Sequence, residues 1–234
     1  MPFFYYGYGF DIWFLPVILA AIWSMWASHK VNSTFKKFSK MSNSRGMTGA
    51  DCARAVLRSG GVNDVKIERV SGNLTDHFDP RTKVIRLSDA VYDSTSVAAL
   101  GVAAHEAGHA VQHEVGYFPI KVRGAIIPVC QIGSNLAMPL VLIGIILSTP
   151  TLAYVGVLFF ALSAFFQLVT LPVEFNASRR ALRALSEQDI LVGGELASAK
   201  KVLSAAAMTY VAALAVALAN LLRLFMLVNR NSRN

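Results

Sequence analysis

Four long stretches of this chain contain almost no charged residues, and this pattern limits the possible folds more than any other feature of the sequence. Each is close to or above the ~20 residues that a helix needs to cross the hydrocarbon core of a membrane. A chain of 234 residues cannot bury four such helices in one soluble core. We therefore predict a mainly α-helical membrane protein with about four transmembrane helices, over Phe10–Ala27, Ala125–Leu147, Thr151–Leu171 and Ala205–Val228.

The basic residues predict the orientation of these helices. Fourteen of the 22 Lys and Arg residues lie in residues 28–124, and five more lie in 172–203. By the positive-inside rule, both segments face the cytoplasm and the N-terminus lies outside. The net charge of +8 is explained by this distribution, so we do not expect a nucleic-acid partner. Residues 1–9 contain no Lys or Arg, so the first stretch is interpreted as a retained anchor rather than a cleaved signal peptide.

The same pattern divides the chain into five predicted segments. They are an N-terminal membrane anchor (1–27), a catalytic segment (28–124), a transmembrane hairpin (125–171), a cytosolic helix (172–203), and a C-terminal membrane helix with its tail (204–234). The charges define the topology of the last segment least. A fourth full span would place Arg230 and Arg233 outside the cytoplasm, which the positive-inside rule disfavours.

Local signals in residues 28–124 predict a mixed α and β structure. Thr48 is a suitable N-cap for a helix that Gly60 and Gly61 would end. Apolar and polar residues alternate over 65–70 and 83–87, as in half-buried strands. A turn at 79–82 would join the second strand to one over 74–78 in a hairpin. A buried helix is then expected from Ser94 or Thr95 to about Val115.

The segment His105-Glu106-Ala107-Gly108-His109 carries the clearest chemical signal. Two histidines four residues apart project from the same face of a helix, so their imidazoles can bind one Zn²⁺. A glutamate beside the first histidine is placed to take a proton from an attacking water molecule. We therefore predict His105 and His109 as zinc ligands and Glu106 as the general base of a metallopeptidase.

A catalytic zinc site needs a third protein ligand, and three residues are candidates. His113 lies one turn beyond His109, but three successive turns of one helix cannot easily meet one ion. His77 lies in the predicted hairpin. Glu174 follows the transmembrane hairpin, which returns the chain to the side of the membrane that holds His109. We favour Glu174, while an ion pair with a nearby arginine is its alternative role.

These residues together resemble the YugP-type membrane neutral zinc metallopeptidases of bacteria. The resemblance covers essentially the whole chain and rests on three segments, Asp76–Pro80, His105–His113 and Glu174–Ala177. It implies a bacterial inner-membrane protein whose active site faces the cytoplasm, with zinc held by two histidines and one glutamate.

A more distant likeness is to the HtpX-like and CAAX-prenyl endopeptidases. In those relatives an aspartate four residues after the zinc glutamate supports a histidine ligand, but Ser178 stands at that position here. The analogy also implies that the strand over 74–78 lies at the edge of the cleft and binds an extended substrate. His77 would then contact the substrate and help to hold the oxyanion. Alternative residues for the oxyanion are Tyr92, Tyr117, Arg179 and Arg180, and the alternative role of His77 is to stabilise the turn.

The sequence therefore predicts a membrane-embedded zinc endopeptidase with a zincin-like subdomain, protein or peptide substrates, and membrane lipid as its surroundings. The alternative is an inactive membrane scaffold that retains a zinc site. Glu106 argues against this alternative, because a purely structural site needs no base. A transporter would place ionisable groups within its spans, whereas here they cluster outside the four stretches.

Overall fold

The computed structural model describes residues 12–232, which form six helices and one small sheet. The predicted start of the first stretch at Phe10 lies outside the described residues. The elements in chain order are α1 (Phe14–Phe38), α2 (Gly49–Ser59), β1 (Lys66–Val70), β2 (His77–Asp79), β3 (Val84–Ser88), α3 (Val97–Glu114), α4 (Phe118–Ile146), α5 (Pro150–Glu187) and α6 (Gly193–Asn231).

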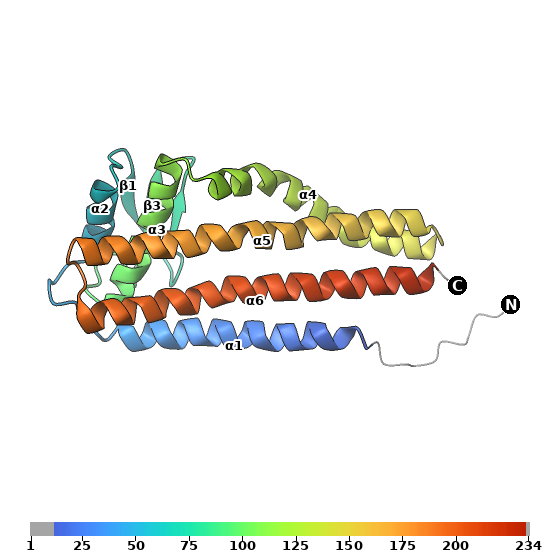
Figure 1. Ribbon diagram of the computed structural model, residues 1–234, viewed down its shortest axis with the longest axis horizontal. Coiled ribbons are helices and arrows are strands. Elements are labelled where there is room, and N and C mark those ends of the chain that lie inside the picture. Colours follow the sequence, from blue (N-terminus) through green and yellow to red (C-terminus); the bar gives the residue numbers. More distant parts are fainter. Residues whose placement is uncertain (1–11, 233–234) are drawn as a thin grey trace.

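Four of the helices, α1, α4, α5 and α6, are long and apolar enough to cross a membrane. Helix α6 packs between α1 and α5, and α4 packs against α5. Figure 1 shows α1, α5 and α6 running lengthwise together, while α2, α3 and the sheet gather at one end. The number of long apolar helices predicted from the sequence is confirmed.

Large apolar side chains cover much of the outer surface of these four helices. Such an extended apolar surface is unfavourable in water and favourable against lipid chains. Examples with more than half of their area exposed are Leu19, Met25, Ile132, Ile146 and Leu158. The outward-facing side of the bundle is therefore a lipid-facing surface.

Small residues allow α4 and α5 to approach closely. A Cβ atom added to Gly144 would lie 2.4 Å from the backbone nitrogen of Ala153, and one added to Gly156 would lie 2.7 Å from the carbonyl oxygen of Ala137. Backbone contact of this kind is a common source of packing energy between helices in lipid. The hairpin thus holds α5 in a fixed place relative to α4.

Helices α5 and α6 are much longer than a membrane span. They contain 38 and 39 residues, about 57 Å at 1.5 Å per residue, whereas the hydrocarbon core is about 30 Å thick. The segment 172–203, predicted as one helix, is divided between the end of α5 and the start of α6. The break between the two helices comprises residues 188–192. Asp189 within the break and Gly193 at the start of α6 both have positive φ.

The globular end contains a three-stranded sheet in the order β1-β3-β2. The predicted hairpin is confirmed, because β2 pairs antiparallel with β3 in the register Phe78 to Ile85. Strand β1 pairs in parallel with β3, an arrangement that the sequence did not indicate. The order leaves β2 at an edge of the sheet, where it contacts α3.

The turn between β2 and β3 is held by Asp79. Its carboxylate accepts hydrogen bonds from the Arg81 backbone N–H at 2.9 Å and from the Thr82 hydroxyl at 2.8 Å. The Thr82 and Arg81 bonds lower the pKa of Asp79 from 3.8 to about 2. The carboxylate form of Asp79 therefore stabilises the turn that positions β2.

We expect the substitution Asp79→Asn to lower the melting temperature at pH 7. Because the folded-state pKa lies below the ordinary value, the contribution of Asp79 is complete above about pH 4 and is lost as the pH falls towards 2. The difference between wild type and Asp79→Asn should therefore shrink over that range, as measured by thermal unfolding in detergent. Glu114→Gln on the exposed end of α3 is the control. An equal difference at pH 7 and at pH 2.5 would contradict this account.

Candidate metal centre

Helix α3 carries the two predicted histidine ligands out of the protein core. Its N-cap is Ser96, whose side chain accepts a hydrogen bond from the Ala99 N–H, one or two residues later than the sequence indicated. The first two turns are almost completely buried, so the register of the helix is fixed by packing. His105 and His109 follow on consecutive turns, with ring centroids 4.7 Å apart.

A close contact between α3 and α5 brings Glu174 to these histidines. A Cβ atom added to Gly108 would lie 2.7 Å from the carbonyl oxygen of Ala177. No residue larger than glycine fits there without displacing the backbone of one helix. Glu174 lies one turn before Ala177 on α5, and its side chain is only 3% exposed.

The three predicted ligands converge on one point. One carboxylate oxygen of Glu174, Oε2, lies 3.2 Å from Nε2 of His105 and 3.5 Å from Nε2 of His109. Ligand atoms from these three residues all lie within 4.8 Å of one another, an arrangement that could hold a metal ion. Two imidazole nitrogens and one carboxylate oxygen form a donor set that suits zinc.

Hydrogen bonds on the far side of each imidazole support this interpretation. Nδ1 of His105 lies 3.1 Å from the Ser178 hydroxyl, and Nδ1 of His109 lies 3.0 Å from the amide oxygen of Gln112. Gln112 can only accept at that oxygen, so His109 carries a proton on Nδ1, and the neutral form of the ring presents a lone pair at Nε2. In the neutral imidazole that lone pair faces the Glu174 carboxylate, and a cation between them removes the repulsion. The residues therefore fit a zinc ion.

Gln112 also connects α3 to α5. It is completely buried, and its amide nitrogen donates to the Val173 carbonyl at 2.8 Å and to Asn176 Oδ1 at 3.0 Å. Asn176 Oδ1 accepts a second bond from Arg180 Nε at 2.8 Å. A buried amide with all of these partners fixes both the distance between the helices and the orientation of His109.

The other oxygen of Glu174 contacts a cation that sequence reasoning did not assign to the site. Nη1 of Arg123, at the start of α4, lies 3.3 Å from Oε1 of Glu174. The Nε atom of Arg123 is buried and has no hydrogen-bond partner among the described residues. Arg123 therefore orients the carboxylate and, within this part of the chain, keeps its buried Nε–H unpaired.

These groups line a cavity of about 290 Å³. Glu106 lines it together with the three ligands, as does His77 from β2. The structure thus places every predicted site residue at one cavity. The remaining lining residues are Asp76, Phe78, Pro80, His113, Ile120, Arg123, Gly124, Ile127 and Tyr210.

Asp76 is a second carboxylate in this cavity, also unassigned by the sequence analysis. Burial raises its pKa, and the nearby charge of Glu106 adds to this effect. The backbone N–H and hydroxyl of Ser88 donate to its two oxygens at 2.7 and 3.0 Å. Asp76 thus anchors the start of β2 to the end of β3, directly before His77.

The two rejected candidates for third ligand have other contacts. His113 packs edge-on against Phe78, with centroids 5.5 Å apart. Nδ1 of His77 lies 2.8 Å from the Thr75 carbonyl and can donate to it. His77 is exposed at the mouth of the cavity, which is compatible with a contact to a substrate but not with the buried cluster of ligand atoms.

Comparison with known proteins agrees with this geometry. The sequence model of a family described as "Putative neutral zinc metallopeptidase" matches residues 13–229. The chain belongs to this family. The match spans all four long helices as well as the globular end, so the membrane helices are part of the family fold.

The chain is also similar to a curated protein from Bacillus subtilis (strain 168), named "Putative membrane protease YugP". The two are 45% identical over 222 residues, which cover 94% of this chain and 98% of that protein. No solved structure gives a significant match to the chain. The resemblance noted from the motifs is thereby confirmed, and the protein is a membrane member of a zinc-metallopeptidase family.

We expect Gly108→Ala to separate α3 from α5 and to abolish tight zinc binding. The added methyl group would meet backbone atoms that cannot rotate away, and overpacking of this kind costs about 1–3 kcal/mol of stability. Gly194→Ala is the matched control, because its Cβ would enter open space. Zinc content and thermal unfolding of both variants measure the effect. Normal zinc content in Gly108→Ala would contradict the proposed role of this contact.

Ser178→Ala should weaken zinc binding without unfolding the protein. The hydroxyl that holds His105 is lost, and removal of such a supporting contact typically lowers metal affinity about 10–100-fold. Ser178→Thr retains a hydroxyl and should restore the affinity. The measurement is zinc competition with a chromophoric chelator. Equal affinities for Ser178→Ala and wild type would show that the Ser178 contact does not support the site.

Proposed function

We propose that this protein is a zinc endopeptidase that hydrolyses peptide bonds of protein substrates at the cytoplasmic surface of a bacterial inner membrane. The observation that carries the proposal is the convergence of His105, His109 and Glu174 at a cavity that Glu106 also lines. A structural metal site needs neither the cavity nor the additional carboxylate. The family membership described above favours the same activity.

In this proposal the protein residues have separate roles. His105, His109 and Glu174 hold the ion, and zinc, when bound, supplies a Lewis acid that activates water and polarises the scissile carbonyl. Glu106 takes the proton of the attacking water and passes it to the leaving amine. Arg123, which also lines the cavity, holds the Glu174 carboxylate in place.

The edge strand β2 supplies a place for an extended substrate. Within the described residues β2 pairs with β3 alone, so its outer edge offers backbone groups to a peptide added as a further strand. His77, which begins β2 and lines the cavity, would contact that peptide near the scissile carbonyl. A hydrogen bond from His77 would help to stabilise the oxyanion.

The charge distribution supports the proposed cytoplasmic orientation. The globular end lies between α1 and α4, in the segment that holds most of the basic residues of the chain. Basic loops are retained on the cytoplasmic side of a bacterial membrane. A substrate would therefore approach as a cytoplasmic protein or as the cytoplasmic part of a membrane protein.

The test separates metal binding from catalysis. Protein purified in detergent should contain about one zinc ion per chain by elemental mass spectrometry, and His109→Ala and Glu174→Ala should each lose it because too few ligands remain. Glu106→Gln should keep the zinc and lose at least 100-fold in cleavage of an unfolded protein such as casein.

Three outcomes would contradict parts of this proposal. Unchanged proteolysis by Glu106→Gln would exclude Glu106 as the base. Normal zinc content in Glu174→Ala would assign the third ligand elsewhere, with His113 and His77 next to be substituted. Zinc in wild type, together with no cleavage of any unfolded protein, would favour the inactive scaffold.

A further inference from the structure

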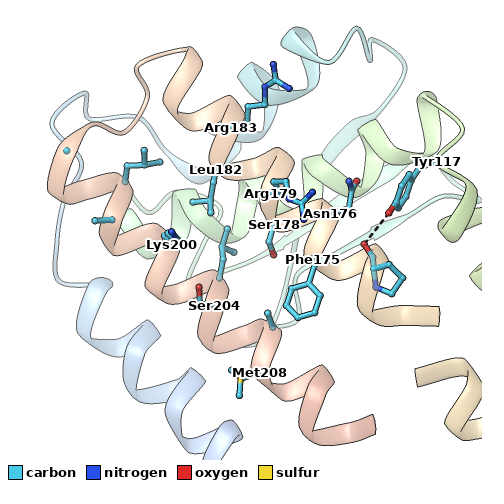
Figure 2. A pocket seen from close by; sticks show the side chains of 16 residues that line it. Tyr117, Phe175, Asn176, Ser178, Arg179, Leu182, Arg183, Lys200, Ser204 and Met208 are labelled. Atoms are coloured by element: carbon cyan, nitrogen blue, oxygen red, sulfur yellow. Dashed lines mark hydrogen bonds between the residues drawn. The ribbon is translucent and has the colours of Figure 1, made fainter. Parts of the chain in front are cut away.

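A large open groove lies between α5 and α6, on a part of the surface that the proposed metal site does not use. Its volume is about 1040 Å³. Figure 2 shows residues of α5 and α6 facing each other across it, with Arg179 on one helix and Lys200 on the other. Neither Arg179 nor Lys200 forms an ion pair within the described part of the chain, whereas the third cation, Arg183, pairs with Glu187 at 2.7 Å.

The lining of this groove combines positive charge with an apolar wall. No Asp or Glu is among its sixteen lining residues. Phe175 and Met208 lie towards the membrane from the two cations, and Phe175 is 43% exposed. A ligand that matches both parts carries negative charge at one end and a hydrocarbon chain at the other.

The groove lies at the level where the helices leave the membrane. The uncharged stretch of α5 ends at Leu171, and Arg179 lies eight residues later, or about 12 Å along the helix. Side chains of a helix lean towards its N-terminus, which for α5 is the membrane side. On α6 the uncharged stretch starts at Ala205, about 7.5 Å along the helix from Lys200. The lean of α6 side chains is away from the membrane, but the long stem of Lys200 can turn its ammonium group towards the headgroups. The headgroup region extends about 5–8 Å beyond the hydrocarbon, within reach of both cations.

A second groove on the other side of α6 extends the same pattern. It lies between α1 and α6, has a volume of about 600 Å³ and shares Lys200, Ser204 and Met208 with the first. Its other cations are Lys30, Lys37 and Lys201, and it too has no acidic residue in its lining. Basic residues thus line the two neighbouring grooves on α5, α6 and α1.

We propose that the groove between α5 and α6 binds an anionic phospholipid. The phosphate lies between Arg179 and Lys200, and an acyl chain runs past Phe175 and Met208 towards the hydrocarbon core. A basic pocket between helices at the cytoplasmic side of a membrane has the chemistry required for an acidic headgroup. The proposal depends on the groove alone and not on the proteolytic activity.

The bound lipid would lie next to the residues that support the metal ligands. Ser178 and Asn176 both line the groove. Ser178 contacts His105, and Asn176 accepts a hydrogen bond from Gln112, which in turn holds His109. An occupied groove therefore packs against the supports of both histidines, while the ligands themselves face the cavity on the other side.

The test measures binding to the full-length protein, so it does not depend on catalysis. Delipidated protein in a neutral detergent is titrated with phosphatidylglycerol and, separately, with phosphatidylcholine of the same acyl chains, and bound lipid is counted by native mass spectrometry. We expect phosphatidylglycerol to bind at least 10-fold more tightly. The double variant Arg179→Gln/Lys200→Gln should weaken this binding about 30-fold, because each of the two basic residues removed usually contributes about 5-fold near an anionic surface.

Two further variants distinguish a defined lipid-binding site from general electrostatic attraction between the protein and an anionic lipid. Lys36→Gln/Lys40→Gln removes the same charge from exposed positions on and just after α1 that line neither groove, and it should change the affinity less than 3-fold. Ser204→Trp keeps every charge but fills the floor of the groove, and it should weaken phosphatidylglycerol binding at least 10-fold. Thermal unfolding checks that each variant is folded.

The proposal would be overturned by any of four results. These are equal affinity for the two lipids, equal loss in the two charge variants, unchanged binding by Ser204→Trp, or full displacement of the lipid by an equal concentration of glycerol 1-phosphate. The last result would assign the cations to a free phosphate rather than to a lipid. Zinc content and casein cleavage are recorded in parallel, so a failure of the proposed enzyme activity remains distinguishable.

Discussion

The contact between Gly108 of α3 and Ala177 of α5 is the constraint on which the metal centre depends. It joins two parts of the chain that are 69 residues apart and belong to different environments, a helix of the globular end and a helix that continues into the membrane. Gln112 adds a polar contact to this packing, because one buried amide bonds to His109, to the Val173 carbonyl and to Asn176. The carboxylate of Glu174 is thereby held against two imidazoles, although no segment of sequence contains all three ligands.

The membrane provides the second constraint. In lipid the hydrophobic effect does not drive helices together, so the bundle depends on backbone contact at small residues such as Gly144 and Gly156. At the globular end the core is of the ordinary water-excluding kind, with Leu87, Leu100 and Leu185 completely buried. Helices α5 and α6 contribute residues both to the lipid-facing bundle and to the core of the globular end. Because the same two helices serve both regions, a chain of 234 residues can form four long helices and the metal centre.

Several parts of this arrangement were predictable because they depend on local rules. Charge-free length predicted the four long helices, and the spacing of His105 and His109 predicted two imidazoles on one face. Glu174 was predictable because a hairpin returns the chain to the same side of the membrane. The pairing of β2 with β3 followed from the turn residues after Asp79.

Other parts depend on tertiary contact and had no comparable signal. Arg123 is an ordinary basic residue before an apolar stretch, and only the packing of α4 brings it to Glu174. The parallel pairing of β1 with β3 is not encoded in the alternation of either strand. Helix α5 continues through Pro172, because flanking packing can retain a helix that lacks one N–H. The hydroxyl of Ser178 reaches Nδ1 of His105 at 3.1 Å, a contact that only the packing of α5 against α3 creates.

The continuity of α5 through Pro172 has a mechanical consequence. The lipid-facing residues of this helix and the carboxylate of Glu174 belong to one rigid rod, whereas His105 and His109 are fixed to the globular end. A displacement of the rod by a single residue moves Glu174 by about 1.5 Å along the axis, which is large compared with the tolerance of a zinc–oxygen bond of about 2.1 Å. The contacts of Gly108 and Gln112 that hold α5 against α3 are therefore what keeps the three donor atoms together, while the rest of the same helix lies among the apolar spans.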